Sequence, residues 1–396
     1  MPIKNPFRAT DDAFHLLGRD VERQRAAKAL RDPAAKLLIL APRKTGKTTL
    51  IRAAAADARS AGSHVITANL AGISCLTDVA SRILRAAAAE TSRAWPDATG
   101  ELVRRLAIKV TLEADSRTGA ILPSIDPALR RAVLEEQHAL LRRVLDTLNE
   151  LAHAHDARLG IALDEVQELF RLGGSSADWA LASAARQHAS LCYLLSSSAE
   201  AASHPSPTAD RSPLSLFEAL YLGPLPHHQV AGWIDDQLRL AGIKPQGTGE
   251  SISRLGGRKL ANVAQIAAYC FDGVRTSGFA RAEDVDVAFA TAVGDCADIT
   301  RSVWESLTAH QQNVLRALSV KSHGLTTSAT RERFSLGDTG TTHNSAQLLV
   351  RKGILERTDG GYLFESPFVR GWVIAHALAD VGITLPITHV PPTREH

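Results

Sequence analysis

The sequence predicts an α/β protein with a five-stranded parallel sheet, followed by a small helical domain and a winged helix-turn-helix domain. Two observations predict it. Short β-rich segments alternate with helical segments over about the first 225 residues, which is the pattern of a parallel, doubly wound sheet. After residue 300, three helical segments precede two β-rich runs around residues 359–361, the order of a winged helix-turn-helix.

The five expected strands follow one another with clear boundaries. The apolar run Leu37 to Leu40 is the first, and a polar loop then leads into an Ala-rich helix that Gly62 ends. The segment HVITANL is the second strand, and LGIALDE, SLCYLLSSS and ALYLGPL are the third to fifth. Ligands of such sheets bind at the carboxyl ends of the strands, where every candidate motif of this chain falls.

The chain is long enough for several domains with separate cores, at 396 residues. We expect a core over 1–225, with a helical insertion over about 85–158 whose middle is broken by Pro and Gly. This core is followed by a strand-free helical lid over 226–300 and a winged helix over 301–378. The last residues, 379–396, are Pro-rich and are expected to form a flexible tail.

Composition excludes several classes of protein. Hydrophobic residues make up 45% and charged residues 22%, which is ordinary for a soluble globular protein, and the net charge of +3 leans only slightly towards nucleic acid. The four cysteines lie far apart without a C-x-x-C pair, so neither a zinc knuckle nor a disulfide framework is expected. Without an apolar signal core or a membrane-spanning run, the expectation is a cytoplasmic protein with no membrane partner.

The segment LLILAPRKTGKTTL has the strand–loop–helix order of a P-loop, whose backbone N–H groups and helix N-terminus wrap a polyphosphate. Lys47 would reach the β- and γ-phosphates, and the Thr48 hydroxyl would bind Mg²⁺. Ala41 departs from the pattern, because it stands where the first Gly is expected. The alternative is a basic surface turn before a helix. The predicted phosphate-binding residues are Pro42, Arg43, Lys44, Thr45, Gly46, Lys47, Thr48 and Thr49.

A second motif, the apolar strand ending in Asp164 and Glu165, gives two carboxylates with different roles. Asp164 would hold Mg²⁺ together with Thr48, and Glu165 would activate the water that attacks the γ-phosphate. The alternative is a strand that ends in a charged, exposed turn. Because no guanine-reading N/T-K-x-D motif occurs, the expected cofactors are ATP and Mg²⁺.

Three serines, Ser196 to Ser198, end the fourth strand. A polar residue there, for which we take Ser197, can lie between the two nucleotide motifs and sense the γ-phosphate. The alternative is that the serines only initiate a turn.

These motifs together resemble the AAA+/STAND-type P-loop ATPases, and above all the archaeal and bacterial ATP-binding proteins related to origin-recognition initiators. GRDVERQRAAKAL resembles the helix that opens that group's ATPase domain, and APRKTGKTTL resembles its G/A-P-R-x-T-G-K-T/S loop, which also accounts for Ala41. GGYLFESPFVRGWV resembles the wing and final helix. The likeness covers most of residues 10–378.

The resemblance implies further roles. Gly18 and Arg19 would border the adenine, and Arg211 matches an arginine finger that acts on the nucleotide of a neighbouring subunit. Arg258 or Lys259, in Gly257-Arg258-Lys259 where relatives often have G-H-P, would contact the γ-phosphate from the lid, and we take Arg258. The alternatives are a surface arginine at Arg211 and a solvated basic turn at Arg258.

The sequence therefore favours an ATP-dependent switch or motor, with Lys47, Glu165 and Arg211 in catalysis and a lid and winged helix that respond to the nucleotide. Residues 344–352 would enter the major groove of duplex DNA if the winged helix binds DNA. The other hypothesis is a nucleotide-gated signalling or scaffold protein with very slow turnover, which binds a protein partner through the insertion or winged helix. An arginine finger would also require a nucleotide-dependent homo-oligomer.

Overall fold

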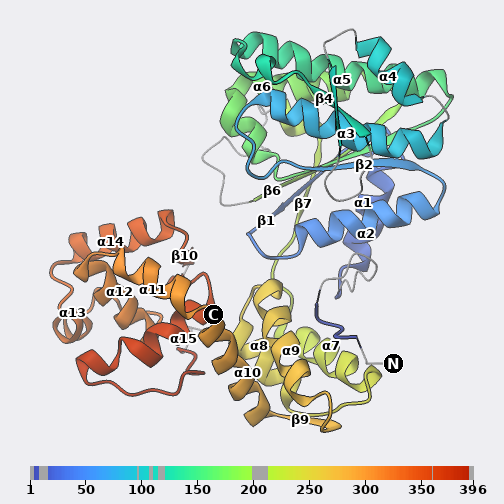
Figure 1. Cartoon of the computed structure of the whole chain (residues 1–396). Coiled ribbons are helices and arrows are strands. Elements are labelled where there is room, and N and C mark those ends of the chain that lie inside the picture. Colours follow the sequence, from blue (N-terminus) through green and yellow to red (C-terminus); the bar gives the residue numbers. More distant parts are fainter. Residues whose placement is uncertain are drawn as a thin grey trace. The chain divides into compact units, whose positions relative to one another are not determined.

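The computed structural model describes residues 4–8, 17–95, 98–106, 110–114, 121–198, 213–358 and 360–391. The chain forms two compact units, Asp11–Gly223, here named the core unit, and Met1–Thr10 with Pro224–His396, here named the C-terminal unit (Figure 1). Arg211 and Asp359 lie outside the described residues. No helix among the described residues is long and apolar enough to cross a membrane.

The core unit contains the five-stranded parallel sheet that the sequence predicts. Its order is β2-β5-β6-β1-β7, and every neighbouring pair is parallel. Since the strands run in one direction, their carboxyl ends meet at one edge. The strands are β1 (Leu37–Ala41), β2 (His64–Asn69), β5 (Leu159–Asp164), β6 (Leu191–Ser198) and β7 (Glu218–Tyr221), with a 3₁₀ turn, η3 (Pro213–Leu216), before β7.

Helices cover both faces of this sheet (Figure 1). On one face, Leu37 and Ile39 of β1 pack with the buried residues of α1 and α2. On the other face, Leu38 and Leu40 pack with α3, α5 and α6. Alternate residues of the apolar run thus enter different cores, as a strand of a doubly wound sheet requires. The helices are α1 (Asp20–Ala29), α2 (Lys47–Ser60), α3 (Leu76–Ala94), α5 (Leu134–Ala154) and α6 (Gln167–Gln187).

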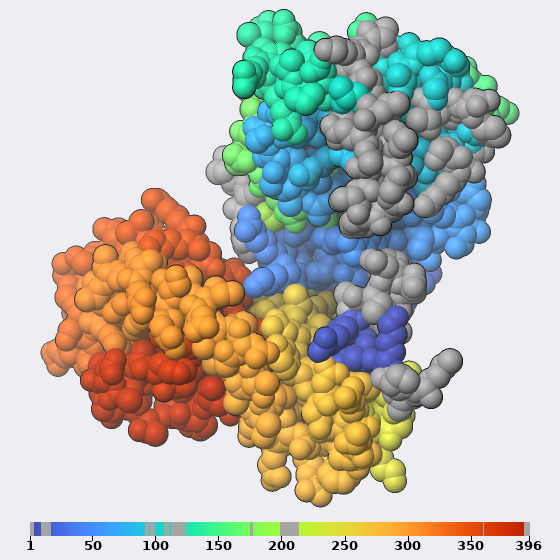
Figure 2. All heavy atoms as spheres, in the orientation of Figure 1, coloured from blue at the N-terminus to red at the C-terminus, as the bar shows by residue number. Residues whose placement is uncertain are grey.

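The insertion between β2 and β5 is not purely helical. Between α4 (Ala98–Leu106) and η1 (Pro127–Arg131), strands β3 (Val110–Ala114) and β4 (Ile121–Ile125) form an antiparallel pair, which corrects our expectation of an irregular middle. Ile125 is buried in the core cluster, so this pair packs on the helices. Its strands are short and one contains Pro123, so they leave only a weak strand pattern in the sequence. The cyan-to-green atoms of the insertion form much of the core unit's visible surface in Figure 2.

The first part of the C-terminal unit is a helical region, named the lid here after the role that the sequence leads us to expect. Two three-residue strands, β8 (Lys244–Gln246) and β9 (Phe279–Arg281), pair in parallel there, although we expected no strand between residue 226 and the wing. Strands this short leave no periodic signal in a sequence. The helices are α7 (His227–Leu240), α8 (Thr248–Gly256), α9 (Leu260–Val274) and α10 (Ala282–Asp295).

The rest of the C-terminal unit is the predicted winged helix. Thr308 and Asp338 cap two of its helices through their side chains, which explains where these helices begin. The wing is an antiparallel hairpin. Ile383, which we expected in a flexible tail, is buried in the core of this domain. The elements are α11 (Ala297–Glu305), α12 (Ala309–Val320), α13 (Ser328–Phe334), α14 (Thr339–Arg351), β10 (Leu355–Thr358), β11 (Gly361–Phe364), α15 (Pro367–His376) and η4 (Ala379–Val381).

Candidate functional site: a phosphate loop and an acidic strand end

The loop between β1 and α2 has the backbone that a phosphate cradle needs. Gly46 is the N-cap of α2 in a left-handed conformation, with φ 97°, and Lys44 has φ 63°. The Thr45 hydroxyl donates to the Pro42 carbonyl at 2.7 Å, which closes the loop on itself. Backbone N–H groups at the start of a helix attract anions, so this loop is suited to a phosphate group.

Ala41 is accommodated without strain. It is the last residue of β1, buried and paired with Ser198 of β6, and it is not among the residues with positive φ. Only a left-handed backbone would require glycine at this position. The departure from the usual motif therefore leaves the loop intact.

Lys47 lies beneath the loop. Its side chain is only 4% exposed, and its ammonium group donates to the carbonyls of Ala41 and Pro42, both at 3.1 Å. Its ammonium group therefore lies directly under the backbone of the loop, within reach of a phosphate held there.

The Asp164 carboxylate joins the loop to the sheet edge. One oxygen, Oδ2, accepts from the Thr48 hydroxyl at 2.6 Å and from the Asn69 amide at 3.2 Å. The other, Oδ1, accepts from the Ser196 hydroxyl and from the backbone N–H of Glu165 at 3.1 Å. A carboxylate beside a hydroxyl at a phosphate loop is the donor set that Mg²⁺ takes at nucleotide sites, so these residues fit the ion.

Glu165 follows immediately and has an unusual backbone, with φ 61°. The Gln167 side chain donates to the Glu165 carboxylate, while its amide oxygen accepts from the backbone N–H of Ser198 at 3.2 Å. A left-handed non-glycine residue stores strain and is typical of functional sites. The carboxylate is thus held at the carboxyl edge of the sheet by the end of β6.

None of the protein-family models and none of the curated proteins matches the chain. Solved structures do match. A Walker-type ATPase of Pyrococcus abyssi is similar at 16% identity and TM-score 0.55, covering 93% of this chain and 99% of its own. The ORC2 protein of Aeropyrum pernix, in complexes described as ADPNP–ADP, is similar at 13% identity and TM-score 0.55, covering 96% and 97%. Its ADP form gives 15% identity and TM-score 0.52, over 91% and 93%.

The chain has the fold of the AAA+ P-loop ATPases. Both the predicted fold class and the resemblance are therefore confirmed at the level of the fold.

Within this AAA+ fold, three residues at the site were not anticipated as site residues from the sequence. Asn69 was overlooked, although it is the last residue of β2. The register of β2 on β5 pairs Asn69 with Asp164, and this brings its side chain to the site. Ser196, rather than Ser197, contacts Asp164, because successive residues of a strand point to opposite faces. Gln167 lies two residues past Glu165, where a polar side chain at a helix start gave a signal that we did not use.

The remaining predicted residues fall into two groups. Gly18 has a left-handed backbone, with φ 56°. The Arg19 side chain is 6% exposed and donates to the Gly223 carbonyl at 2.5 Å and to the Glu22 carboxylate at 3.1 Å. Both residues therefore lie where α1 meets the end of β7. Arg258 belongs to the C-terminal unit, and Arg211 lies outside the described residues, so their roles stay predictions. Arg43 is exposed and Thr49 half-buried at the loop.

Proposed function

We propose that the chain binds Mg·ATP at the phosphate loop and hydrolyses its β–γ bond. The observation that carries this proposal is the 2.6 Å hydrogen bond between Thr48, on the helix after the loop, and Asp164, at the end of β5. Two motifs 116 residues apart thus meet, and a hydroxyl and a carboxylate are the side chains that would hold a nucleotide-bound Mg²⁺.

Each residue of the site has a defined task in this proposal. The loop N–H groups and Lys47 bind the phosphates, and Lys47 exchanges its carbonyl acceptors for phosphate oxygens. Thr48 and Asp164 would hold Mg²⁺, which when bound neutralises charge on the β- and γ-phosphates. Glu165 accepts the proton of the attacking water. The ADPNP and ADP complexes of the A. pernix protein support adenine nucleotides as the ligands.

Phosphate release from Mg·ATP by the purified protein tests this function. Lys47→Ala and Glu165→Gln should each abolish turnover, and Glu165→Gln should retain nucleotide binding. The matched controls are Lys28→Ala, at an exposed lysine of α1, and Glu168→Gln, in the first turn of α6. Full turnover by Lys47→Ala would refute the proposal.

One observation favours a second function, a nucleotide-gated switch with very slow turnover. The Glu165 carboxylate already accepts a hydrogen bond from Gln167, so it must leave this partner before it can orient a water. A slow switch predicts that Gln167→Ala raises the turnover rate, whereas a simple ATPase predicts no gain. Single-turnover phosphate release by the two proteins separates these functions.

We also propose that α14 of the winged helix contacts duplex DNA, since Asn344 and Arg351 are exposed on it and Lys352 is exposed at its C-cap. His343, just before these residues, is a weaker candidate, since it is hydrogen-bonded to Gln347 at 2.8 Å and to Tyr362 at 3.1 Å. Replacing Arg351 and Lys352 with Glu should weaken DNA binding and reduce its salt dependence. An unchanged affinity would remove DNA from the proposal.

The other proposed partners are proteins. The exposed side chains of Val133 and Trp179, 64% and 57% exposed, support a protein contact at the insertion and α6. Arg211 as a finger that acts on the nucleotide of a neighbouring subunit requires ATP-dependent assembly of several copies of the chain. Size-exclusion chromatography with and without ATP tests it, and a constant monomer would exclude a finger acting between subunits.

A further inference from the structure

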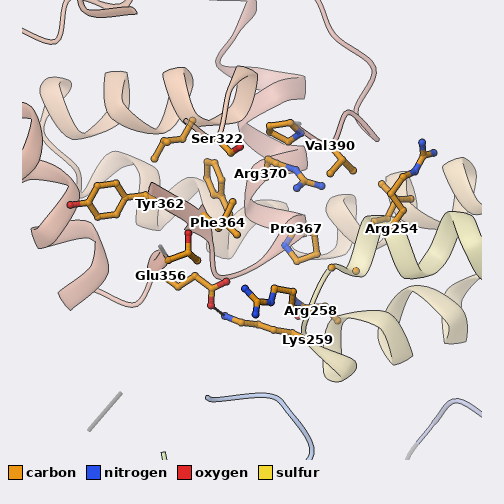
Figure 3. Close-up of a pocket in the computed structure, with 18 of the residues that line it drawn as sticks. Arg254, Arg258, Lys259, Ser322, Glu356, Tyr362, Phe364, Pro367, Arg370 and Val390 are labelled. Carbon is orange, nitrogen blue, oxygen red and sulfur yellow. Dashed lines mark ion pairs between the residues drawn. The ribbon is translucent and has the colours of Figure 1, made fainter. Parts of the chain in front are cut away.

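The C-terminal unit contains a cavity of about 520 Å³ with a concentration of cationic side chains in its wall. Arg254 comes from α8, Arg258 and Lys259 from the loop before α9, and Arg370 from α15, as Figure 3 shows. Elements that are far apart in the sequence therefore bring four cations to one cavity. None of the nucleotide motifs uses Arg254 or Arg370.

Arg370 is the decisive member. Its Nε and Nη2 atoms are buried and have no hydrogen-bond partner among the described residues. Burial lowers the pKa of its guanidinium to about 10, which still leaves it charged at neutral pH. Two buried guanidinium nitrogens without hydrogen-bond acceptors are costly, and an anion would offset that cost.

The other charges around the cavity do not satisfy Arg370. Glu356 is the one acidic residue among the described residues of the wall, and it pairs with Lys259 at 2.8 Å. Lys259 pairs in addition with Glu365. The described ion pairs include none for Arg254, Arg258 or Arg370, so the wall keeps an excess of positive charge.

Two helix starts add to this field. Lys259 is the N-cap of α9, and Pro367 is the first residue of α15, and both residues line the cavity. The N-terminal turn of a helix carries partial positive charge and free N–H groups, which favour an anion. This effect acts in the same direction as the arginines.

We propose that this cavity binds a small organic phosphate, with Arg370 as its principal partner. Guanidinium groups match phosphate oxygens with two hydrogen bonds, and several unpaired cations favour a dianion over a single carboxylate. The volume lies within the range of small-molecule sites, about 300–1,000 Å³. Leu255, Leu318 and Phe364 give apolar wall for the organic part. Because Nε and Nη2 of Arg370 are buried, the site favours a small anion that can enter the cavity over the backbone of a DNA duplex.

The test uses inorganic pyrophosphate as the probe and the full-length chain. Lys47→Ala serves as the background, because it weakens the phosphate loop as a competing site. Calorimetric titration should show saturable binding to Lys47→Ala, and adding Arg370→Gln should weaken it about tenfold to a hundredfold. The control adds Arg275→Gln instead, at an exposed arginine of the same unit, and should leave the affinity unchanged.

Other outcomes would overturn the proposal. Equal pyrophosphate affinity with and without Arg370→Gln would remove the site. If succinate binds as tightly as pyrophosphate, the site does not select phosphate, and the proposed ligand class is refuted. If duplex DNA displaces pyrophosphate, and this displacement requires Arg370, the site belongs to DNA instead. Circular dichroism checks that Arg370→Gln is folded. If it is not, Arg254→Gln takes its place, and an unchanged affinity there likewise counts against the proposal.

Discussion

Lys259 offers the sharpest test of how the lid and the wing are joined. Its side chain is 6% exposed, and its ammonium group lies 2.8 Å from the Glu356 carboxylate and also pairs with Glu365. These carboxylates belong to the wing and to the residue that follows it, whereas Lys259 precedes α9 of the lid. Lys259→Met keeps the apolar stem and removes the charge, so both carboxylates lose their shared partner.

The expected loss follows from the burial of the three groups. Removing one partner of a buried ion pair costs about 3–5 kcal/mol, because the remaining charge is left without compensation. Glu356 and Glu365 keep 19% and 14% of their side-chain exposure, so water screens part of that cost. We therefore expect Lys259→Met to lower the free energy of unfolding of the C-terminal unit by about 3 kcal/mol.

Urea unfolding followed by tryptophan fluorescence, with native-state hydrogen exchange of α9 and the wing, measures this loss. Lys244→Met, at an exposed lysine of the same unit, is the control and should change little. Adding Glu356→Gln and Glu365→Gln to Lys259→Met should recover most of the stability. A loss below about 1 kcal/mol, or no recovery on neutralising the two carboxylates, would refute the reasoning.

Three further predictions concern the core unit. Ser196→Ala removes a charge-assisted hydrogen bond to Asp164 and should lower the free energy of unfolding by about 1.5–3 kcal/mol, whereas Ser197→Ala should cost less than 1 kcal/mol by the same urea measurement. Burial lowers the pKa of His188 in the folded state, so its contribution to stability is complete above the unfolded pKa of about 6.5 and is lost as the pH falls below it. His188→Gln should therefore flatten the stability curve between about pH 5 and pH 7, and an unchanged slope would exclude His188 as the cause. Gly160→Ala would place a Cβ 2.7 Å from the Leu30 carbonyl oxygen and should cost about 2 kcal/mol of thermal stability, while Gly100→Ala, which meets open space, should not destabilise.

The sequence by itself determined the parts of this protein that depend on neighbouring residues. An apolar run followed by Gly46-Lys47-Thr48 predicts a strand, a phosphate loop and a helix, because strand burial and the left-handed glycine are local requirements. The same holds for the strand before Asp164 and for the wing hairpin. Five strands alternating with helices then leave a parallel sheet as the expected arrangement.

Only the tertiary structure decided which of several chemically similar residues meet. Ser196 and Ser197 are the same amino acid, but successive strand residues point to opposite faces of the sheet. Only the arrangement of β6 therefore shows that Ser196 is the one that contacts Asp164. The register of β2 on β5 brought Asn69 to the same carboxylate. The ion pairs of Lys259 with its two glutamates depend on packing between segments about 100 residues apart. The same holds for the cavity that Arg370 lines together with Arg254 and Arg258. Such contacts arise from the shape of the assembled chain, which no local pattern of residues encodes.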